Sequence, residues 1–218
     1  HGSRGLAEDE AFVRKRWHGV VFEPDAYAPA VEGMLRETGL VETLTGSGFV
    51  EAECIGGRLE SIVLNDGSRL RAGTWIDATE TGALCRACGA GVVPRGAAPL
   101  NAVSLIYRIT PAQSPGIEPI PGGIPSACWW RDEFPVMSCV QYPNKDRSCN
   151  MLPTMSAEEC LALGPRAAYM ECGRRVKAHW RWVQQRYPEF RQYRIAQIAP
   201  RLGIRETIHL DCEYMLCG

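Results

Sequence analysis

Two tight-turn signals in the first half of the chain restrict its fold more than any other feature. Gly56-Gly57 and Asp66-Gly67 are dipeptides that favour two-residue hairpin turns, because their residues adopt positive φ angles readily. The segments beside these turns are rich in apolar and β-branched residues, as strands are. We therefore predict a β-meander with strands at Phe49–Ile55, Arg58–Leu64 and Leu70–Ala78.

Apolar residues at spacings of three and four predict the helices. One such helix spans Pro24–Thr38, where Pro24 suits the first turn and Gly39 the C-terminal cap. A short helix is expected at Gly82–Cys88, a helical stretch after a capping box at Ser156, and a long helix that ends near Tyr187. Further strands are predicted at Leu40–Thr45, Ala102–Ile109, Val136–Tyr142, Ser148–Leu152 and Thr207–Leu216.

The charge balance excludes some partners. Lys+Arg is 24 and Asp+Glu is 25, without the basic excess typical of a nucleic-acid binder. The basic residues of the long helix are therefore interpreted as a solvated face, and we expect no nucleic-acid partner. No apolar run approaches the roughly 20 residues of a membrane span, so we expect no membrane partner. A signal-peptide pattern is lacking, and the cytoplasm is the default expectation. The composition leaves the oligomeric state open.

Ten cysteines are irregularly spaced, and the only close pair is Cys85-Arg86-Ala87-Cys88. A zinc site would need a second such pair or a matching pair of histidines, so we expect no metal. At i and i+3 on a helix, Cys85 and Cys88 are predicted to be reduced packing residues that are not bonded to each other. The alternative is a cysteine-based metal or redox module.

The last predicted strand has one polar face. His209, Asp211 and Glu213 alternate with apolar residues, and neighbours at this spacing lie about 7 Å apart. They can line a site, and a histidine there can act as a general acid or base near neutral pH. The alternative is an ordinary strand face turned to solvent.

Several segments together resemble one family. They are Phe22-Glu23-Pro24 and the helix after it, Arg58–Ile62, Asp66-Gly67, the run Trp75-Ile76-Asp77-Ala78-Thr79-Glu80-Thr81-Gly82, Cys88-Gly89-Ala90, Asn150–Thr154, and Arg201–His209 with its Arg-Glu-Thr motif. In this order they are similar to the FAD-dependent oxidoreductases with a glutathione-reductase-type flavin domain. In that family the strand ending in Asp-Ala-Thr lies against the flavin-binding loop. The resemblance covers roughly residues 20–218.

Departures from the family pattern qualify this expectation. In the family, the ADP part of FAD is bound by a strand, a glycine-rich turn and a helix, and no such segment precedes residue 22. The dinucleotide fingerprint is not formed by Gly46-Ser47-Gly48 or by Gly89-Ala90-Gly91 either. Glu80 stands where many flavoproteins have glycine. The chain begins without Met, and no C-terminal flavin segment follows. We therefore expect a processed chain, an expressed fragment or an isolated domain that holds FAD weakly or not at all.

The resemblance implies an α/β fold, mixed α and β. Residues 1–95 would be a partial FAD-binding domain, and residues 96–218 a substrate domain with an antiparallel sheet and a long covering helix. It implies hydride transfer between FAD and a small-molecule substrate in the full-length protein. Ala78 and Thr79 would approach the cofactor by backbone, Arg205 would hold an anionic group, and His209 would move a proton. The alternative is a catalytically silent fragment or interaction domain without bound cofactor.

Overall fold

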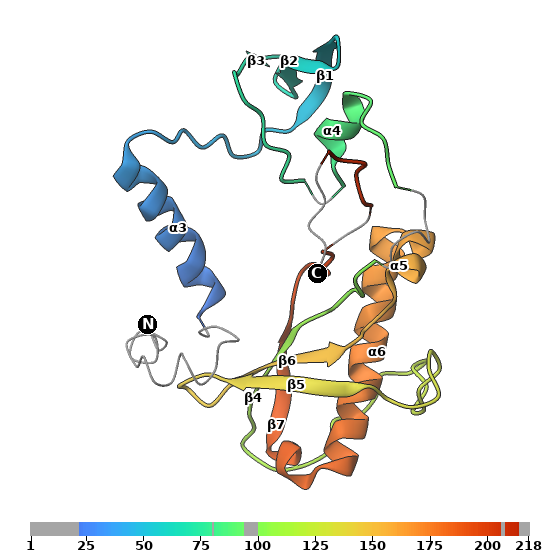
Figure 1. Cartoon of the computed structure of the whole chain (residues 1–218). Helices are drawn as coiled ribbons and strands as arrows, with labels where there is room; N and C mark the ends of the chain where they lie inside the picture. The colour runs from blue at the N-terminus through green and yellow to red at the C-terminus, as the bar shows by residue number, and fades with distance from the viewer. Residues whose placement is uncertain (1–21, 80, 94–99, 206–207, 214–218) are drawn as a thin grey trace. The chain divides into compact units, whose positions relative to one another are not determined.

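A computed structural model describes residues 22–79, 81–93, 100–205 and 208–213. It shows a mixed α/β fold, as predicted (Figure 1). The chain divides into two compact units, which are described separately. Unit 1 comprises 1–41 and 102–203, and unit 2 comprises 42–101 and 204–218. The boundaries of these units differ from the predicted domain boundary after residue 95. The division into a flavin part and a substrate part stays a prediction.

Unit 1 contains a four-stranded antiparallel sheet in the order β5-β6-β4-β7. The strands are β4 (Tyr107–Pro111), β5 (Val136–Gln141), β6 (Arg147–Leu152) and β7 (Tyr193–Ile198); the helices of this unit are α3 (Pro24–Thr38), α5 (Ala157–Leu163), α6 (Pro165–Arg186) and the 3-10 helix η1 (Pro188–Gln192). Helix α6 crosses one face of the sheet, where the rings of Tyr107 and Trp180 meet edge to face with centroids 6.1 Å apart (Figure 1).

The core of unit 1 lies between this sheet and α6. The apolar spacing that predicts the long helix is confirmed in the centre of α6, because Cys172, Val176, Trp180 and Val183 are all buried. The interpretation of the basic residues as a solvated face was wrong for Arg175, of which only 3% is exposed. Its guanidinium is neutralised by carboxylates of Glu159 and Glu171, as a buried charge requires.

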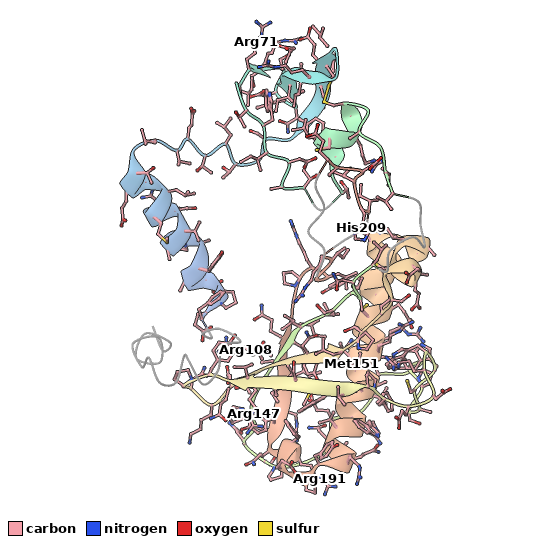
Figure 2. The ribbon with its side chains drawn as sticks, in the orientation of Figure 1. Arg71, Arg108, Arg147, Met151, Arg191 and His209 are labelled. Atoms are coloured by element: carbon pink, nitrogen blue, oxygen red, sulfur yellow. A yellow bond between two sulfur atoms is a disulfide. The ribbon has the colours of Figure 1, made fainter. Side chains whose placement is uncertain are left out.

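Local signals set the ends of the helices of unit 1. Helix α3 has the predicted bounds, with Pro in its first turn and Gly39 at the C-cap with φ 64°. The Ser156 side chain accepts a hydrogen bond of 3.1 Å from the Glu159 amide, which is the predicted N-cap of α5. Helix α3 is tied to the sheet at its N-cap, where Glu23 accepts two hydrogen bonds from Arg108. Arg108 is labelled in Figure 2.

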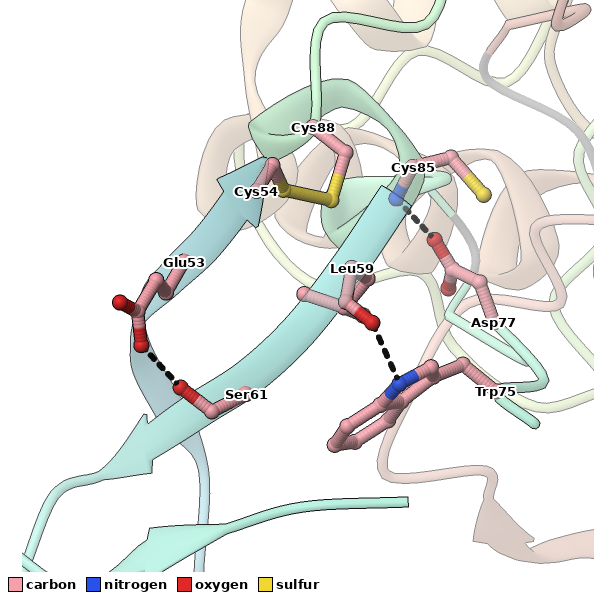
Figure 3. Close-up of a disulfide and its surroundings, with 8 residues drawn as sticks. All are labelled: Glu53, Cys54, Leu59, Ser61, Trp75, Asp77, Cys85 and Cys88. Atoms are coloured by element: carbon pink, nitrogen blue, oxygen red, sulfur yellow. Dashed lines mark hydrogen bonds between the residues drawn. A yellow bond between two sulfur atoms is a disulfide. The ribbon is translucent and has the colours of Figure 1, made fainter. Parts of the chain in front are cut away.

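Unit 2 is built on a smaller antiparallel sheet in the order β1-β2-β3. Its elements are β1 (Phe49–Ile55), β2 (Arg58–Leu64), β3 (Arg69–Leu70) and helix α4 (Ala83–Ala87). Among its described residues only Ser61, Leu64 and Leu84 are buried. The unit therefore has little apolar core. A disulfide between Cys54 and Cys88 joins the end of β1 to the end of α4 (Figure 3).

Four predicted strands are wrong or incomplete. Of Leu70–Ala78 only Leu70 lies in a strand, and Leu40–Thr45 forms no strand. Of Ala102–Ile109 only Tyr107–Ile109 lies in a strand, which is β4. The predicted strand Thr207–Leu216 has one isolated bridge, at Leu210, within residues 208–213; its other residues lie outside the described part. Alternation of apolar and polar residues is not sufficient, because a strand also needs a neighbouring edge to bond.

The described helices give one further result. Within the ranges that the structure describes, none of them combines the length and the apolar composition that crossing a bilayer requires.

Candidate functional site

The candidate site is a pocket in unit 2 with a volume of about 400 Å³. This volume lies in the range of small-molecule sites, which are typically about 300–1,000 Å³. The pocket lies beside helix α4 and strand β2. Its lining residues are Gly57, Leu59, Trp75, Asp77, Leu84, Cys85, Cys88, Gly89 and Ala90. Apolar side chains and glycine backbone thus form most of the wall, with one carboxylate and one free thiol among them.

Trp75 and Asp77 form one wall of the pocket through bonds to unit 2 itself. The indole N–H of Trp75 donates to the carbonyl of Leu59 on β2 at 3.0 Å (Figure 3). One Asp77 oxygen accepts bonds from the amide and hydroxyl of Thr79, at 2.9 and 2.7 Å. The other accepts from the Cys85 amide at 2.9 Å. This turn replaces the predicted end of a strand, because an aspartate side chain competes with strand pairing for nearby amides.

The Asp77 carboxylate is ionised over nearly the whole pH range. Partial burial raises its pKa, but the bonds from the Cys85 amide and from Thr79 outweigh burial, and the pKa falls to about 2. A carboxylate that accepts several N–H and O–H bonds is stabilised in its charged form. The pocket therefore contains one fixed negative charge whose lone pairs are largely occupied.

The cysteines of α4 differ from each other. Cys88 forms the disulfide with Cys54, so the prediction that both Cys85 and Cys88 are reduced packing residues was wrong for Cys88. Cys85 is free, and it is not bonded to Cys88, as predicted. Burial and the neighbouring Asp77 raise the pKa of the Cys85 thiol, which makes it a poor nucleophile at neutral pH.

The C-terminal part of unit 2 packs against the start and the end of α4. Leu210 bridges to Val92, and its side chain lies 3.0 Å from where a Cβ would sit on Gly82. The amide of Val93 donates to the carbonyl of His209 at 2.9 Å. His209 is half-buried and is held in this segment by its backbone (Figure 2).

The structure brings some of the predicted site residues near one another. The Thr79 hydroxyl accepts from the Ala83 amide in the first turn of α4, and the segment of His209 contacts Gly82 at the same turn. Arg205 is exposed and lies outside any strand or helix, and Glu206 and Glu80 lie outside the described residues. None of the four predicted site residues, Ala78, Thr79, Arg205 and His209, is among the residues that line the pocket.

Sequence reasoning missed two features of the site. The Cys54–Cys88 disulfide has no signal in the spacing of the cysteines, since connectivity cannot be deduced from sequence. Asp77 belonged to the quoted motif, but its role as the acceptor for two residues of the turn was not inferred. The part of the chain that the structure describes contains no group of three metal-ligating side chains.

The fold is mixed α/β with a pocket of small-molecule size in unit 2, and comparison with known proteins assigns its family. The model of the FAD dependent oxidoreductase family matches residues 3–218. The chain belongs to this family, which supports a redox function and implies FAD binding in the full-length protein. No curated protein and no solved structure matches the chain.

Proposed function

We propose that this chain is mainly the substrate-binding region of an FAD-dependent oxidoreductase with a glutathione-reductase-type flavin domain. It would act in hydride transfer between FAD and a small organic molecule. The observation that carries this proposal is the family match over residues 3–218. The pocket beside the Asp77–Thr79 turn supports it, because this turn belongs to the motif that resembles the flavin side of the family.

The described residues fit one end of FAD better than the other. Leu59, Trp75 and Leu84 give the pocket apolar surface suited to part of a flat ring system. The phosphates of a dinucleotide need backbone amides of a glycine-rich turn at the start of a helix. Among the described residues, no such turn opens a helix at this pocket; α4 is only five residues long. FAD, when bound, supplies the hydride-accepting ring, and weak retention of FAD by this chain remains our expectation.

The backbone of the turn decides which residue faces a cofactor. Thr79 uses its amide on Asp77, and its carbonyl accepts from the Gly82 amide at 3.3 Å. Ala78 is exposed, and none of the hydrogen bonds within this turn uses its backbone. We therefore assign the closer approach to Ala78 and a supporting role to Thr79.

The roles of Arg205 and His209 follow from charge and exposure. Reduced flavin and many oxidisable acids are anionic, and a guanidinium binds such groups with two parallel hydrogen bonds. Arg205 is exposed, so its guanidinium can reach a bound anion. His209 would move a proton during turnover.

A flavin titration tests the cofactor side. Purified chain is mixed with excess FAD, and the difference spectrum of bound flavin is recorded after each addition. We expect weak binding that Ala78→Phe lowers at least ~10-fold, because the larger side chain blocks the backbone approach. Ala196→Phe, at an exposed position of β7 in unit 1, is the matched control and should leave binding unchanged. An Ala78→Phe variant that binds FAD as tightly as the unchanged chain would refute the assignment of Ala78.

Kinetics of the FAD-loaded full-length protein test Arg205 and His209. Arg205→Ala should lower kcat and kcat/KM together by at least ~10-fold, as expected for a contact made in the transition state. Its melting temperature should not change. His209→Ala should alter chiefly the pH profile. A lowered melting temperature with unchanged kinetics would show that Arg205 only stabilises the local fold and takes no part in the reaction.

A further inference from the structure

Two free cysteines of unit 1 face each other across neighbouring strands. Cys139 on β5 and Cys149 on β6 are register partners, and their sulfur atoms lie 2.8 Å apart in a hydrogen bond. A disulfide bond is about 2.05 Å long, so the two sulfurs are within about 1 Å of bonding distance. Cys149 is fully buried, whereas Cys139 is half-buried on β5, which is an edge strand of the sheet.

The register places this pair where a cross-strand disulfide fits. The amide of Tyr142 donates to the carbonyl of Asp146 at 2.8 Å, so these residues form a hydrogen-bonded pair. Such pairs alternate with non-hydrogen-bonded ones along an antiparallel ladder, which makes Cys139 and Cys149 a non-hydrogen-bonded pair. The Cα atoms of such a pair are about 4.5 Å apart, inside the usual range for disulfides of about 4.4–6.8 Å.

The surroundings favour a reactive Cys139. Arg147 and Cys149 are two residues apart on β6, so both side chains are on the same face of the sheet. The hydrogen bond from Cys149 lowers the pKa of the Cys139 thiol, burial opposes this, and the charge of Arg147 lowers the pKa further. The same hydrogen bond and burial raise the pKa of Cys149. Tyr107 on β4 is the third titratable group at the pair and is neutral, because burial raises the pKa of its hydroxyl.

We propose that Cys139 and Cys149 form a redox-active dithiol that reduces a disulfide substrate and closes to an intramolecular disulfide. The Cys139 thiolate attacks one sulfur of the substrate, whose S–S bond breaks, and the first thiolate leaves. The Cys149 sulfur then attacks the Cys139 sulfur, and the Cys149 proton passes to the second thiolate as that thiolate leaves. Two electrons pass from the cysteine pair to the substrate, which becomes two thiols. This activity is independent of bound FAD.

Oxidised glutathione is the probe for the first test. The full chain, gently reduced so that Cys54–Cys88 stays closed, is mixed with it, quenched in acid and alkylated, and its peptides are identified by mass spectrometry. We expect a Cys139–Cys149 disulfide to form at least ~10-fold faster than glutathione adds to Cys128, because Cys149 and Arg147 stabilise the Cys139 thiolate that attacks. Cys128 is a free, half-buried cysteine of the same unit. Equal rates at Cys139 and Cys128 would overturn the proposal.

Single variants separate the two roles. Cys149→Ser should stop at a stable mixed disulfide on Cys139, whereas Cys139→Ser should leave Cys149 unmodified, because the buried thiol does not react first. Cys128→Ser is the matched control and should behave as wild type. A wild-type chain that keeps the mixed disulfide instead of the cross-strand bond would overturn the proposal. This result needs no variant and therefore stands even if a substitution impairs folding.

Substitutions of Arg147 test its charge through the pH dependence of Cys139 alkylation, which a purely structural role would not change. Arg147→Gln should shift the pH profile of Cys139 alkylation by iodoacetamide toward higher pH, and Arg147→Lys should restore it in part. Arg147 also lies over the rings of Phe190 and Tyr193, so circular dichroism must first show that each variant is folded. An unchanged pH profile in folded Arg147→Gln would contradict the assigned role of this charge.

Discussion

The two units each contain a close pair of cysteines, and the pairs differ in state. In unit 2, Cys54 and Cys88 form a disulfide in a unit with few buried residues. In unit 1, Cys139 and Cys149 are adjacent free thiols in a unit with a large apolar core. A small unit that buries little apolar surface depends on a cross-link, whereas a well-packed one does not. The comparison indicates that one pair is structural and the other is free to react.

The largest expected effect tests the core of unit 1. Trp180 is 1% exposed, and its ring packs against Tyr107 and Phe190. Trp180→Ala should reduce the free energy of unfolding of this unit by about 3–5 kcal/mol, because it leaves a large cavity. Met170→Ala on the same helix, where the side chain is 63% exposed, should change it little. Urea titration followed by circular dichroism at helix wavelengths measures both variants. Equal losses of unfolding free energy in the two variants would show that the buried face of α6 does not stabilise the core of unit 1.

The next effect tests the disulfide of unit 2. Cys54 and Cys88 are 34 residues apart, and a loop of that length corresponds to about 3–4 kcal/mol of constraint on the unfolded chain. The double variant Cys54→Ser, Cys88→Ser should lose that much stability in unit 2 and none in unit 1. Hydrogen exchange of β1 and β2 amides, compared with those of α6, measures the difference. Cys212→Ser, which removes an exposed free thiol of unit 2, is the control. Unchanged exchange in β1 and β2 would contradict the comparison.

The smallest expected effect is the loss of stability at low pH when the Asp77 carboxylate is protonated. Its pKa in the folded chain, about 2, is below the ordinary 3.8, so its contribution to stability is complete above about pH 4. It is lost as the pH falls from about 4 to about 2. The contribution is about 1–2 kcal/mol after allowance for solvent screening of the half-buried group. Following the indole N–H resonance of Trp75 by NMR during acid titration measures it. Asp77→Asn should remove this step, and an unchanged titration in that variant would refute the assignment.

Local signals in the sequence predicted much of the fold. Pro24 and Gly39 correctly predicted the two ends of helix α3, and Gly56-Gly57 predicted the β1–β2 hairpin. Residues of these types determine the local backbone conformation by themselves. The sequence did not indicate strand β7 (Tyr193–Ile198). This short strand exists because β4 offers it an edge, which is a tertiary condition.

The candidate site was less predictable for the same reason. The Asp77-Ala78-Thr79 motif was found by resemblance, but the expected strand there is replaced by a turn held by the Asp77 carboxylate. The cysteine pairings depend on which strands lie side by side, and spacing along the chain does not encode that. The roles of Arg205 and His209 depend on a cofactor and a substrate, and they stay predictions.

Hydrogen exchange of the full chain in a series of glutathione redox buffers tests the difference between the two cysteine pairs most directly. Mass spectrometry assigns the state of each pair in every sample. We predict that opening Cys54–Cys88 accelerates exchange in β1 and β2 at least ~100-fold and leaves α6 unchanged. Closing Cys139–Cys149 should leave the exchange of α6 and of β1 and β2 unchanged. Acceleration in α6 when Cys139–Cys149 changes state, or none in β1 and β2 when Cys54–Cys88 opens, would contradict the account.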